Sequence, residues 1–529
     1  MADEGTGEDI AAFLSRPETY GLAADDRIGC IETHASRVYL AGERVYKLKK
    51  RVDFGFLDFT TLEKRRAAAE NEIALNRRTA PDIYLRTLPV RSKHGELQLG
   101  GSEGEIVDWL VEMRRFPAEG LFARLAEEGR LTRQEIETLA ADVAAFHAHA
   151  EVTRERGGAA LFARIVAGND DNLKDSVGKV FEAEKVARLK AESDRLIARH
   201  AALLDGRRDA GFVRRCHGDL HLGNVTLIGN RPVIFDCVEF SDDIASIDIL
   251  YDLAFLLMDL AFRANTDARL AGFANRALNL YLDHVREEEI EPTLEGLALL
   301  PLFVATRAAV RAKVTAVIAN TEEKRDRSRA YLDFALAVLA STPPRLLAVG
   351  GLSGTGKSTL AMALAPELGH PFGAVHLRSD IIRKRLFHVA PLERLPEAAY
   401  AKDVGRRVYG EMSRLAGLAL KAGMPVVVDA VFSREGERVN VERLAAEAGV
   451  PFCGLWLEAP AAILEARVAT RAAEARDPSD ADVGVLHQQL GYELGIMRWA
   501  RVDASAGPEE SLARAMALLG GGMLEKPQG

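Results

Sequence analysis

The segment GGLSGTGKSTLA, Gly350–Ala361, constrains the fold of this chain more than any other. It follows the apolar run LLAVGG and leads into a helix-forming stretch. Within it, Gly351, Gly356, Lys357 and Ser358 fit the pattern GxxxxGK[ST]. In that pattern the backbone N–H groups surround phosphates, the lysine reaches the β and γ phosphates, and the hydroxyl binds Mg²⁺. The sequence therefore predicts a nucleoside triphosphate site rather than a solvated glycine turn. The predicted nucleotide-binding residues are Gly351, Ser353, Gly354, Thr355, Gly356, Lys357, Ser358 and Thr359, with Ser358 also a predicted metal ligand.

Length and composition indicate a soluble protein of several domains. The chain has 529 residues, of which 48% are apolar, and a net charge of −9 that does not favour nucleic acid. Its acidic start, MADEGTGEDI, predicts no secretory signal, and apolar runs such as 297–306 fall far short of the roughly 18 residues of a membrane span. Four scattered cysteines without CxxC spacing argue against disulfides and zinc. A cytoplasmic location is expected, and nucleic-acid binding stays open only for the C-terminal part.

A second chemical centre lies in the segment CHGDLHLGNVTLIGNRPVIFDCVEF, Cys216–Phe240. His217, Asp219 and Asn224 form HxDxxxxN, and the apolar run PVIF is followed by Asp236. Phosphoryl transfer to a hydroxyl needs one carboxylate that accepts the hydroxyl proton, together with oxygen ligands that hold Mg²⁺ between the phosphates. We therefore predict that Asp219 is the base and that Asn224 and Asp236 are metal ligands.

The N-terminal region reads as strands followed by a helix. The runs 30–42 and 43–50 predict a hairpin that turns at Gly42-Glu43, and alternation places Lys47 on the same face as Val45. A helix is expected over 61–79, and further strands over 84–90, 97–99 and 106–113.

Four other polar residues are assigned structural roles. His147 and His149, at the end of a helix that the capping box TRQE opens, lack ligand companions at metal spacing and are expected to pack or face solvent. Asp248 and Asp252 lie four residues apart at a helix start and are expected to brace the catalytic loop.

The motifs HGDLHLGN, IFDCVEF and IDILYDLAFLL resemble those of the aminoglycoside phosphotransferase-like kinases over roughly residues 25–340. The resemblance implies a two-lobed kinase in which Lys47 contacts the ATP phosphates and pairs with Glu72, which we prefer over Glu70. It also implies that the backbone around Met113, in the hinge at 112–114, holds adenine.

One departure from that family concerns the glycine-rich loop. No GxGxxG is present, and THASRVY occupies its place. Members of the family often use a serine-containing turn there, so the resemblance assigns phosphate capping to Ser36.

The C-terminal part alternates apolar strand-like runs with helical stretches, which predicts a doubly wound parallel sheet. Asp429 ends the buried run PVVVDA and suits the acidic partner of Mg²⁺ in P-loop enzymes. Asp380 follows a second strand, where substrates bind in such sheets. Arg467 and Arg471 share a helix face, so they either close over the transferring phosphoryl group or form a solvated arginine face.

These features resemble the P-loop small-molecule and polynucleotide kinases, a group that includes gluconate kinases, chloramphenicol phosphotransferases and zeta-type toxins. The resemblance covers about residues 345–520. It implies that Asp380 orients or deprotonates the acceptor hydroxyl and that Arg467 and Arg471 form a lid.

The whole chain resembles bacterial fusions of the two kinase types. We predict a lead-in over 1–26, an α+β two-lobed protein-kinase-like domain over 27–342 and an α/β P-loop kinase domain over 345–520, separated near Pro343-Pro344. Each domain is expected to use ATP and Mg²⁺ and to phosphorylate a small-molecule hydroxyl. The alternative is that one domain is a nucleotide sensor or ATPase switch. The sequence identifies neither acceptor, nor the oligomeric state, nor any coupling of the sites.

Overall fold

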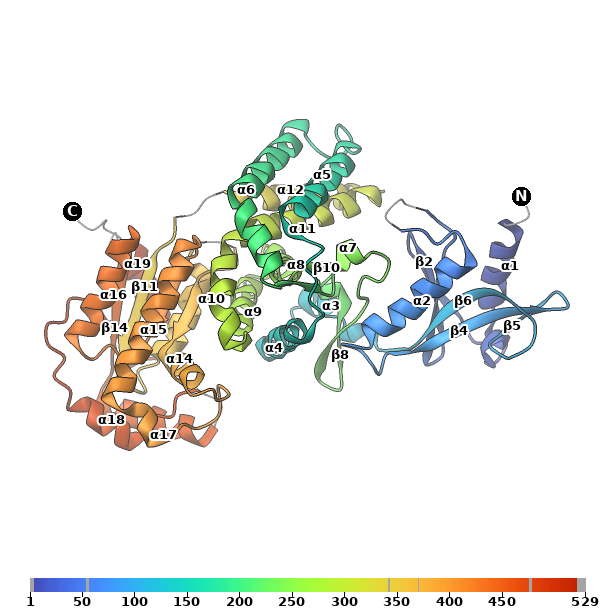
Figure 1. The fold of residues 1–529 in the computed structure, drawn as a ribbon. Coiled ribbons are helices and arrows are strands. Elements are labelled where there is room, and N and C mark those ends of the chain that lie inside the picture. Colours follow the sequence, from blue (N-terminus) through green and yellow to red (C-terminus); the bar gives the residue numbers. More distant parts are fainter. Residues whose placement is uncertain (1–3, 54–56, 341–342, 370, 475–477, 521–529) are drawn as a thin grey trace. The chain divides into compact units, whose positions relative to one another are not determined.

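The computed structural model describes residues 4–53, 57–340, 343–369, 371–474 and 478–520. The chain forms two compact units: the first comprises residues 1–161 and 204–256, and the second comprises residues 162–203 and 257–529. Figure 1 labels many of the helices and strands of both units. The second unit therefore contains helices on both sides of the predicted boundary near residue 343. The predicted domain bounds, 27–342 and 345–520, remain predictions, and residues 341–342 lie outside the described part of the chain.

The first unit contains a six-stranded antiparallel sheet in the order β1-β2-β3-β6-β4-β5. The hairpin predicted at Gly42-Glu43 is confirmed, because Ala41 pairs with Arg44. The single strand predicted over 30–42 is wrong. The hydroxyl of Thr33 accepts a hydrogen bond from Ser36 N–H and forms a turn, so the run splits into two paired strands. The strands are β1 Gly29–Glu32, β2 Ser36–Ala41, β3 Arg44–Lys49, β4 Tyr84–Lys93, β5 Glu96–Leu99 and β6 Glu105–Arg114.

Strand β3 sends alternate side chains to opposite faces of this sheet. Val45 packs against helix α2 (Leu62–Asn76) through Ala69 and Ile73. Tyr46 and Leu48 pack on the other face with helix α1 (Glu4–Leu14). Because strand side chains alternate with period two, Lys47 and Lys49 lie on the α2 side with Val45. The helix predicted over 61–79 is confirmed as α2, and Thr61 caps its N-terminus by accepting from Lys64 N–H.

The remainder of the first unit positions two loops. The hairpin of β8 (Val225–Ile228) and β9 (Arg231–Ile234) separates the loop after β7 (Val213–Arg215) from the segment that follows β9. Strand β10 (Ser246–Asp248) pairs with β7. The capping box predicted at Thr132 is confirmed at the start of α4. The helices are α3 Phe122–Glu127, α4 Arg133–His149, α7 Asp242–Ala245 and the first part of α8 Ile249–Arg263.

Helices form one part of the second unit. They include α5 (Gly158–Lys174) and α6 (Ala183–Asp209), which begin or end in the first unit, and α9 Arg269–His284, α10 Glu287–Gly296, α11 Leu300–Val317 and α12 Glu322–Leu339. The stretch from Glu287 to Val317 is long and apolar enough to cross a membrane, but 78% of its most apolar window is buried. Burial of that kind is what a core helix of a globular unit shows.

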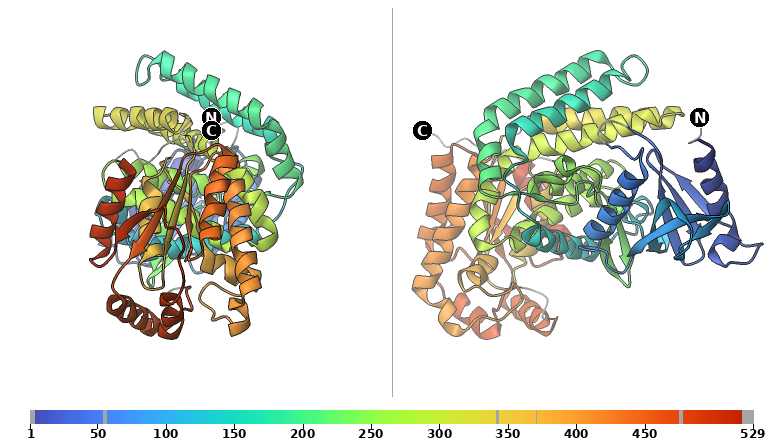
Figure 2. Two further views of the ribbon diagram at one scale, coloured as in Figure 1. Left: turned by 90° about the vertical axis from the view of Figure 1, so that its left-hand side faces the viewer. Right: turned by 45° about the vertical axis from the view of Figure 1, so that its right-hand side comes forward.

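The other part of the second unit is a five-stranded parallel sheet in the order β12-β13-β11-β14-β15. Its helices cover both faces (Figure 2), so the predicted doubly wound fold is confirmed. The strands are β11 Leu346–Gly351, β12 Val375–Arg378, β13 Val426–Asp429, β14 Phe452–Glu458 and β15 Ala500–Asp503. The helices are α13 Lys357–Leu364, α14 Ser379–Leu386, α15 Lys402–Lys421, α16 Glu435–Ala448, α17 Ala461–Glu474, α18 Val483–Leu490 and α19 Pro508–Gly520, of which α18, α19 and the strand β15 were not predicted.

Candidate active sites

A buried network of charges connects β3 and α2 in the first unit. Lys47 Nζ lies 2.8 Å from Glu72 Oε1 and 2.8 Å from Asp236 Oδ1. Glu72 also accepts from Lys49 Nζ at 2.5 Å, and Lys49 contacts Glu239 as well. The pairing of Lys47 with Glu72 is therefore found as predicted. The sequence reading missed Lys49 and Glu239, although the period-two alternation of β3 already placed Lys49 on the side of Lys47.

Burial and charge oppose each other in this network. Burial alone would lower the pKa of Lys47, but the carboxylates of Asp236 and Glu72 outweigh it and raise that pKa well above its usual value. Burial would raise the pKa of Glu72, but the ammonium groups of Lys47 and Lys49 bring it down to about 2. Glu72 is thus ionised at neutral pH and holds Lys47 charged beside Asp236.

The segment that carries Asp236 is fixed by side chains of α2 and β4. Asp236 adopts a left-handed backbone conformation, with φ 63°, that few residues other than glycine, asparagine and aspartate take. Its N–H donates to the Tyr84 hydroxyl at 3.1 Å, and the next N–H, of Cys237, donates to Asn76 Oδ1 at 2.8 Å. These bonds turn the Asp236 carboxylate toward Lys47.

The loop after β7 holds the other predicted catalytic groups. Asn224 Nδ2 donates to Asp219 Oδ2 at 2.9 Å, so the predicted base and the predicted metal ligand lie side by side. His221 Nε2 lies 3.4 Å from the same carboxylate oxygen and was missed in the sequence, although DLH places it two residues after Asp219. His217 Nε2 lies 2.9 Å from Phe235 O, which can only accept, so Nε2 carries the proton. Burial lowers the pKa of His217 and favours this neutral form, whose Nδ1 accepts from Asp219 N–H at 3.3 Å.

Asp252 braces that loop, as the sequence predicts. Its carboxylate accepts from the N–H groups of His217 and Gly218 at 3.0 and 2.9 Å and also contacts His147 Nε2 at 3.1 Å. His147, Cys216 and Asp252 are all buried, and their possible ligand atoms lie within 4.8 Å of one another, so the packing role expected for His147 stays a prediction.

Asp248 does not contact the loop in the same way as Asp252. It binds Arg207 with both oxygens and caps α8 through Leu250 N–H. Strand β10, which it ends, pairs with β7, the strand that leads into the loop, so the bracing role expected for Asp248 stays a prediction.

The family resemblance assigned Ser36 to the phosphates and the backbone of Met113 to adenine. The assignment of phosphate capping to Ser36 is wrong, because Ser36 is a buried strand residue and the turn lies before it. Met113 is buried with Val45 in the core of the sheet, so its side chain is not open to a base. The N–H of Arg114 already donates to Ile83 O at 2.8 Å. The adenine contact at Met113 stays a prediction.

The P-loop of the second unit leaves space where phosphates would sit. Gly356 caps α13 with φ 83°, and a Cβ atom there would meet no atom within 4 Å. At Gly354 a Cβ atom would lie 2.7 Å from Leu464 O, so only glycine allows the loop to approach α17. A loop with free space at its last glycine, at the N-terminus of an eight-residue helix, fits an anionic ligand.

A cavity of about 400 Å³ opens at this loop and brings together several predicted residues. Its lining includes Asp380, Arg467 and Arg471. The guanidinium of Arg467 donates to Ala504 O at 2.8 Å, and that of Arg471 donates to Ala481 O at 2.7 Å, so both arginines hold neighbouring loops. The complete lining is Gly354, Thr355, Gly356, Lys357, Ser358, Thr359, Leu360, Asp380, Leu457, Arg467, Arg471, Ser479, Ala506, Pro508 and Ser511, which does not include the predicted residues Gly351, Ser353 and Asp429.

Asp429 lies at the buried end of β13 in an electropositive surrounding. His376 Nε2 is 3.6 Å and Arg378 Nε is 3.9 Å from its Oδ2 atom. Burial would raise the pKa of Asp429, but His376, Lys357 and Arg378 outweigh it and lower that pKa. The Oδ1 atom is buried without a hydrogen-bond partner among the described residues. An ionised carboxylate with an unused oxygen, on the strand next to β11, fits a role in holding Mg²⁺.

Gln489 is a buried residue that the sequence reading missed. Its Oε1 atom accepts from Ser353 N–H at 2.7 Å and so ties α18 to the P-loop across 136 residues. Only the tertiary fold shows this contact, because a single glutamine in a short helix carries no sequence signal.

Replacing Gln489 with alanine is expected to weaken nucleotide binding in the second unit about tenfold. A buried N–H group left without a partner costs about 1–3 kcal/mol, and 1.4 kcal/mol corresponds to a factor of ten. This affinity is measured by titrating the protein with Mg-ADP. The relevant site is the one whose binding is lost in the Lys357→Ala variant. The exposed neighbour Gln488, replaced by alanine, is the matched control. An unchanged affinity would show that the bond to Ser353 N–H does not shape the loop.

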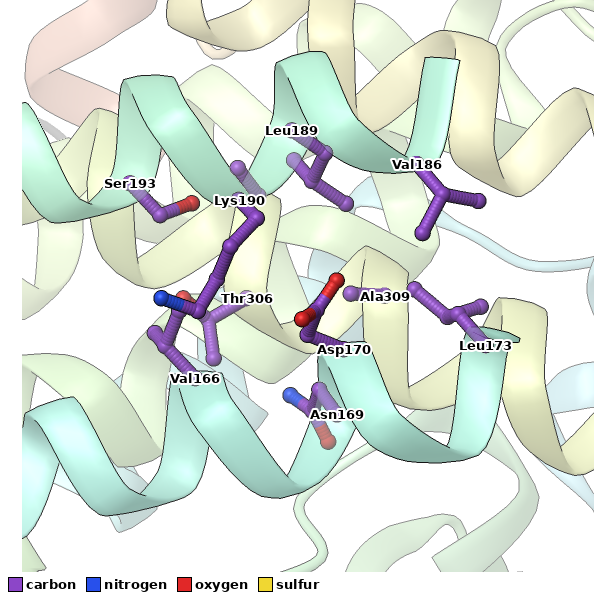
Figure 3. A pocket seen from close by; sticks show the side chains of 11 residues that line it. Val166, Asn169, Asp170, Leu173, Val186, Leu189, Lys190, Ser193, Thr306 and Ala309 are labelled. Carbon is purple, nitrogen blue, oxygen red and sulfur yellow. The ribbon is translucent and has the colours of Figure 1, made fainter. Parts of the chain in front are cut away.

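A second cavity lies between α5, α6 and α11 (Figure 3). Its volume is about 20 Å³, which suits a single water molecule and not a substrate. Asn169 Nδ2 and Asp170 Oδ1, both buried, have no hydrogen-bond partner among the described residues, so a water molecule there would satisfy them.

Two family models match separate segments of the chain. Residues 94–289 match the phosphotransferase enzyme family, and residues 346–493 match an AAA domain family. The chain is 29% identical over 498 residues to an uncharacterized protein of Mycobacterium tuberculosis (strain H37Rv), covering 92% of this chain and 94% of that protein. It is 33% identical over 122 residues to the adenylyl-sulfate kinase of Myxococcus xanthus, covering 23% of this chain and 62% of that enzyme. A choline/ethanolamine kinase family protein from Mesorhizobium loti aligns at 15% identity with a TM-score of 0.38, covering 64% of this chain and 95% of that one.

The two family matches support an ATP-dependent kinase. More particularly, the chain joins an aminoglycoside phosphotransferase-like kinase domain to a P-loop kinase-like AAA domain. Kinases of these families transfer phosphoryl groups to small molecules and use ATP, usually with Mg²⁺.

Proposed function

We propose that the protein is a bifunctional phosphotransferase in which each site moves the γ-phosphoryl group of ATP to a hydroxyl of its own small-molecule acceptor. One observation supports the proposal: each unit has its own group of residues that would fit the phosphates, the metal and the acceptor, and the two groups share no residue. The sets are Lys47, Glu72, Asp219, Asn224 and Asp236 in the first unit and Lys357, Ser358, Asp380 and Asp429 in the second.

In the first unit, Lys47 would hold the ATP phosphates, and the backbone of Met113 would hold adenine. Asp236 has a carboxylate that is 43% exposed, and Asn224 donates through its nitrogen to Asp219, which leaves its amide oxygen to accept. These oxygen donors fit Mg²⁺, which would neutralise charge on the phosphates.

Asp219 would act as the base. The acceptor oxygen forms a bond to the γ phosphorus while the bond from that phosphorus to the β–γ bridging oxygen breaks. ADP leaves with the bridging oxygen, and the acceptor proton passes to the Asp219 carboxylate. His221, 3.4 Å from that carboxylate, and Asn224, 2.9 Å from it, would orient it.

In the second unit, the P-loop residues Gly351 to Thr359 would surround the phosphates, with Lys357 on the β and γ oxygens. Ser358 and Asp429 fit as residues that would hold Mg²⁺. Ser358 has a hydroxyl group and lines the cavity, and Asp429 has a buried oxygen without a hydrogen-bond partner among the described residues. Asp380 would orient or deprotonate the acceptor. Arg467 and Arg471 would stabilise charge on the transferring group from the rim of the cavity, which they already line.

The name of the 33% identical relative supports a small-molecule acceptor for the second site. The alternative of a nucleotide sensor or ATPase switch is not favoured, because both family matches are to kinase-type domains. A cytoplasmic location fits the supply of ATP.

The test uses wild-type protein, Asp219→Ala and Lys357→Ala, each incubated with Mg²⁺, γ-labelled ATP and a metabolite extract whose labelled products are sorted by mass. We expect two labelled compounds, one lost with each variant, because the sites share no residue. The exposed residues Asp209 and Lys402, replaced by alanine, are matched controls. Label found only as free phosphate, or one product lost with both variants, would contradict two independent kinases.

A further inference from the structure

Helix α9 covers the outer edge of the parallel sheet in the second unit. Strand β12 is the first strand in the order of that sheet and pairs only with β13 there, so one side of its backbone needs other partners. Asn275 Nδ2 donates to Phe372 O and to Ala374 O, both at 2.9 Å. Asn279 donates to Ala374 O at 3.0 Å and accepts from His376 N–H at 2.6 Å.

The two asparagines therefore replace a neighbouring strand. An asparagine amide offers a donor and an acceptor side by side, as a peptide group does. Asn279 uses its acceptor on β12 and its donor on Ala374, the residue just before that strand, and both asparagines are buried, with exposures of 2% and 4%. Gly373 makes the approach possible, because a Cβ atom there would lie 2.5 Å from Asn275 Nδ2.

Further contacts fix this part of the second unit beyond the strand. Arg385 donates to Leu282 O, and Arg414 Nη1 lies 2.6 Å from Glu291 Oε2. Helix α9 lies within the segment 94–289 that matches the phosphotransferase family, whereas β12 lies within the segment 346–493 that matches the AAA domain. The sheet of one kinase-type domain is thus completed by a helix of the other.

Strand β12 carries groups of the P-loop site. Its register places Arg378 opposite Asp429, and His376 Nε2 lies 3.6 Å from Asp429 Oδ2. Asp380, two residues beyond the strand, lines the nucleotide cavity. Asn279 therefore holds the same strand that carries His376 and Arg378 beside Asp429. That strand also leads to Asp380, the predicted acceptor-binding carboxylate.

We propose that Asn275 and Asn279 are positioning residues of the P-loop site. They hold β12 against β13 and thereby place His376 and Asp380, so the C-terminal site is complete only with helix α9 of the phosphotransferase segment. The P-loop itself follows β11, in the middle of the sheet, which β13 separates from this edge strand. The inference rests on the proposed function of the second site.

The experiment compares full-length wild type with Asn279→Ala. Hydrogen exchange of peptides from 371–380 is expected to speed up at least tenfold, while exchange of β14 stays unchanged. Affinity for Mg-ADP at the Lys357-dependent site is expected to fall several-fold, while affinity for metal-free ADP stays at the wild-type value because the P-loop is intact. Asn265→Ala, an exposed asparagine just before α9, is the control.

Two outcomes would overturn the proposal. If Asn279→Ala exchanges over 371–380 at the wild-type rate and binds Mg-ADP with wild-type affinity, the hydrogen bonds of the asparagine side chains do not position β12. If exchange is faster throughout the second unit and the affinities for Mg-ADP and metal-free ADP fall equally, α9 stabilises the unit as a whole and does not position the site. If Asn279→Ala does not fold, Asn279→Asp keeps the acceptor for His376 N–H and loses the donor to Ala374 O. Asn279→Asp should then show faster exchange over 371–380 and weaker Mg-ADP binding, both to a smaller extent. The absence of these changes would also overturn the proposal.

These readouts require no turnover, so they separate this inference from the proposed function. A wild-type protein that forms no labelled product in the extract would contradict the proposed function alone. Exchange and ADP binding would still decide whether α9 positions the strand.

Discussion

Replacing Asp219 with asparagine is expected to lower the rate of phosphoryl transfer in the first unit by a factor on the order of 10²–10⁴, the usual contribution of a general base. Asparagine has the same shape and can still accept from Asn224 Nδ2, which lies 2.9 Å away, but its amide cannot take the acceptor proton. The measurement is the single-turnover rate of the labelled product that Asp219→Ala removes.

Nucleotide binding separates the possible reasons for such a loss. The affinity for Mg-ADP in the first unit should change less than about twofold, because Lys47 and Asp236 remain paired at 2.8 Å. Asp209→Asn, an exposed carboxylate of the same unit, should leave the rate unchanged. An unaltered rate in Asp219→Asn would exclude it as the base, and a rate loss matched by lost Mg-ADP affinity would assign it to metal or nucleotide binding instead.

Local sequence patterns predicted the P-loop and its sheet well. The glycine positions, the helix that begins at Lys357 and the buried strand that ends at Asp429 all follow from short-range rules on loops, caps and apolar runs. The same holds for Asp219 and Asn224, which lie five residues apart within one loop.

Contacts between distant parts of the chain were beyond those rules. Asn279 and His376 are 97 residues apart, and Gln489 and Ser353 are 136 apart. A polar residue on a helix gives no sign of its partner until the helix packs, because its periodicity reports only which face is buried. Ser36 shows the opposite error: the family resemblance placed it in a phosphate-capping turn, whereas it is a buried residue at the start of β2.

Replacing Glu72 with glutamine is expected to destabilise the first unit by about 3 kcal/mol, the lower end of the cost of breaking a buried ion pair. Glu72 is fully buried and accepts from two ammonium groups, those of Lys47 and Lys49. Each lysine keeps one other carboxylate, Asp236 or Glu239, which limits the loss. Local opening free energies from hydrogen exchange of β3 and β6 measure the change.

Glu239→Gln is the matched control for Glu72→Gln, because both carboxylates contact Lys49. Burial raises the pKa of Glu239, and the charge of Lys49 offsets that only in part. Its ionised form is therefore held less favourably, and its replacement should cost only about 1 kcal/mol. Equal losses for the two variants would contradict the different electrostatic roles assigned to them.

The pH dependence of the Glu72→Gln effect follows from the direction of the pKa shift. The pKa of Glu72 is about 2 in the folded protein against an ordinary value of 4.5, so its ionised form stabilises the fold above pH 4.5. That contribution, about 3 kcal/mol for a shift of this size, is lost as pH falls from 4.5 toward 2. The stability difference between wild type and Glu72→Gln should therefore be full at pH 6 and less than half as large at pH 3. A difference that stays constant down to pH 3 would mean that Glu72 stabilises the fold by packing rather than by its charge.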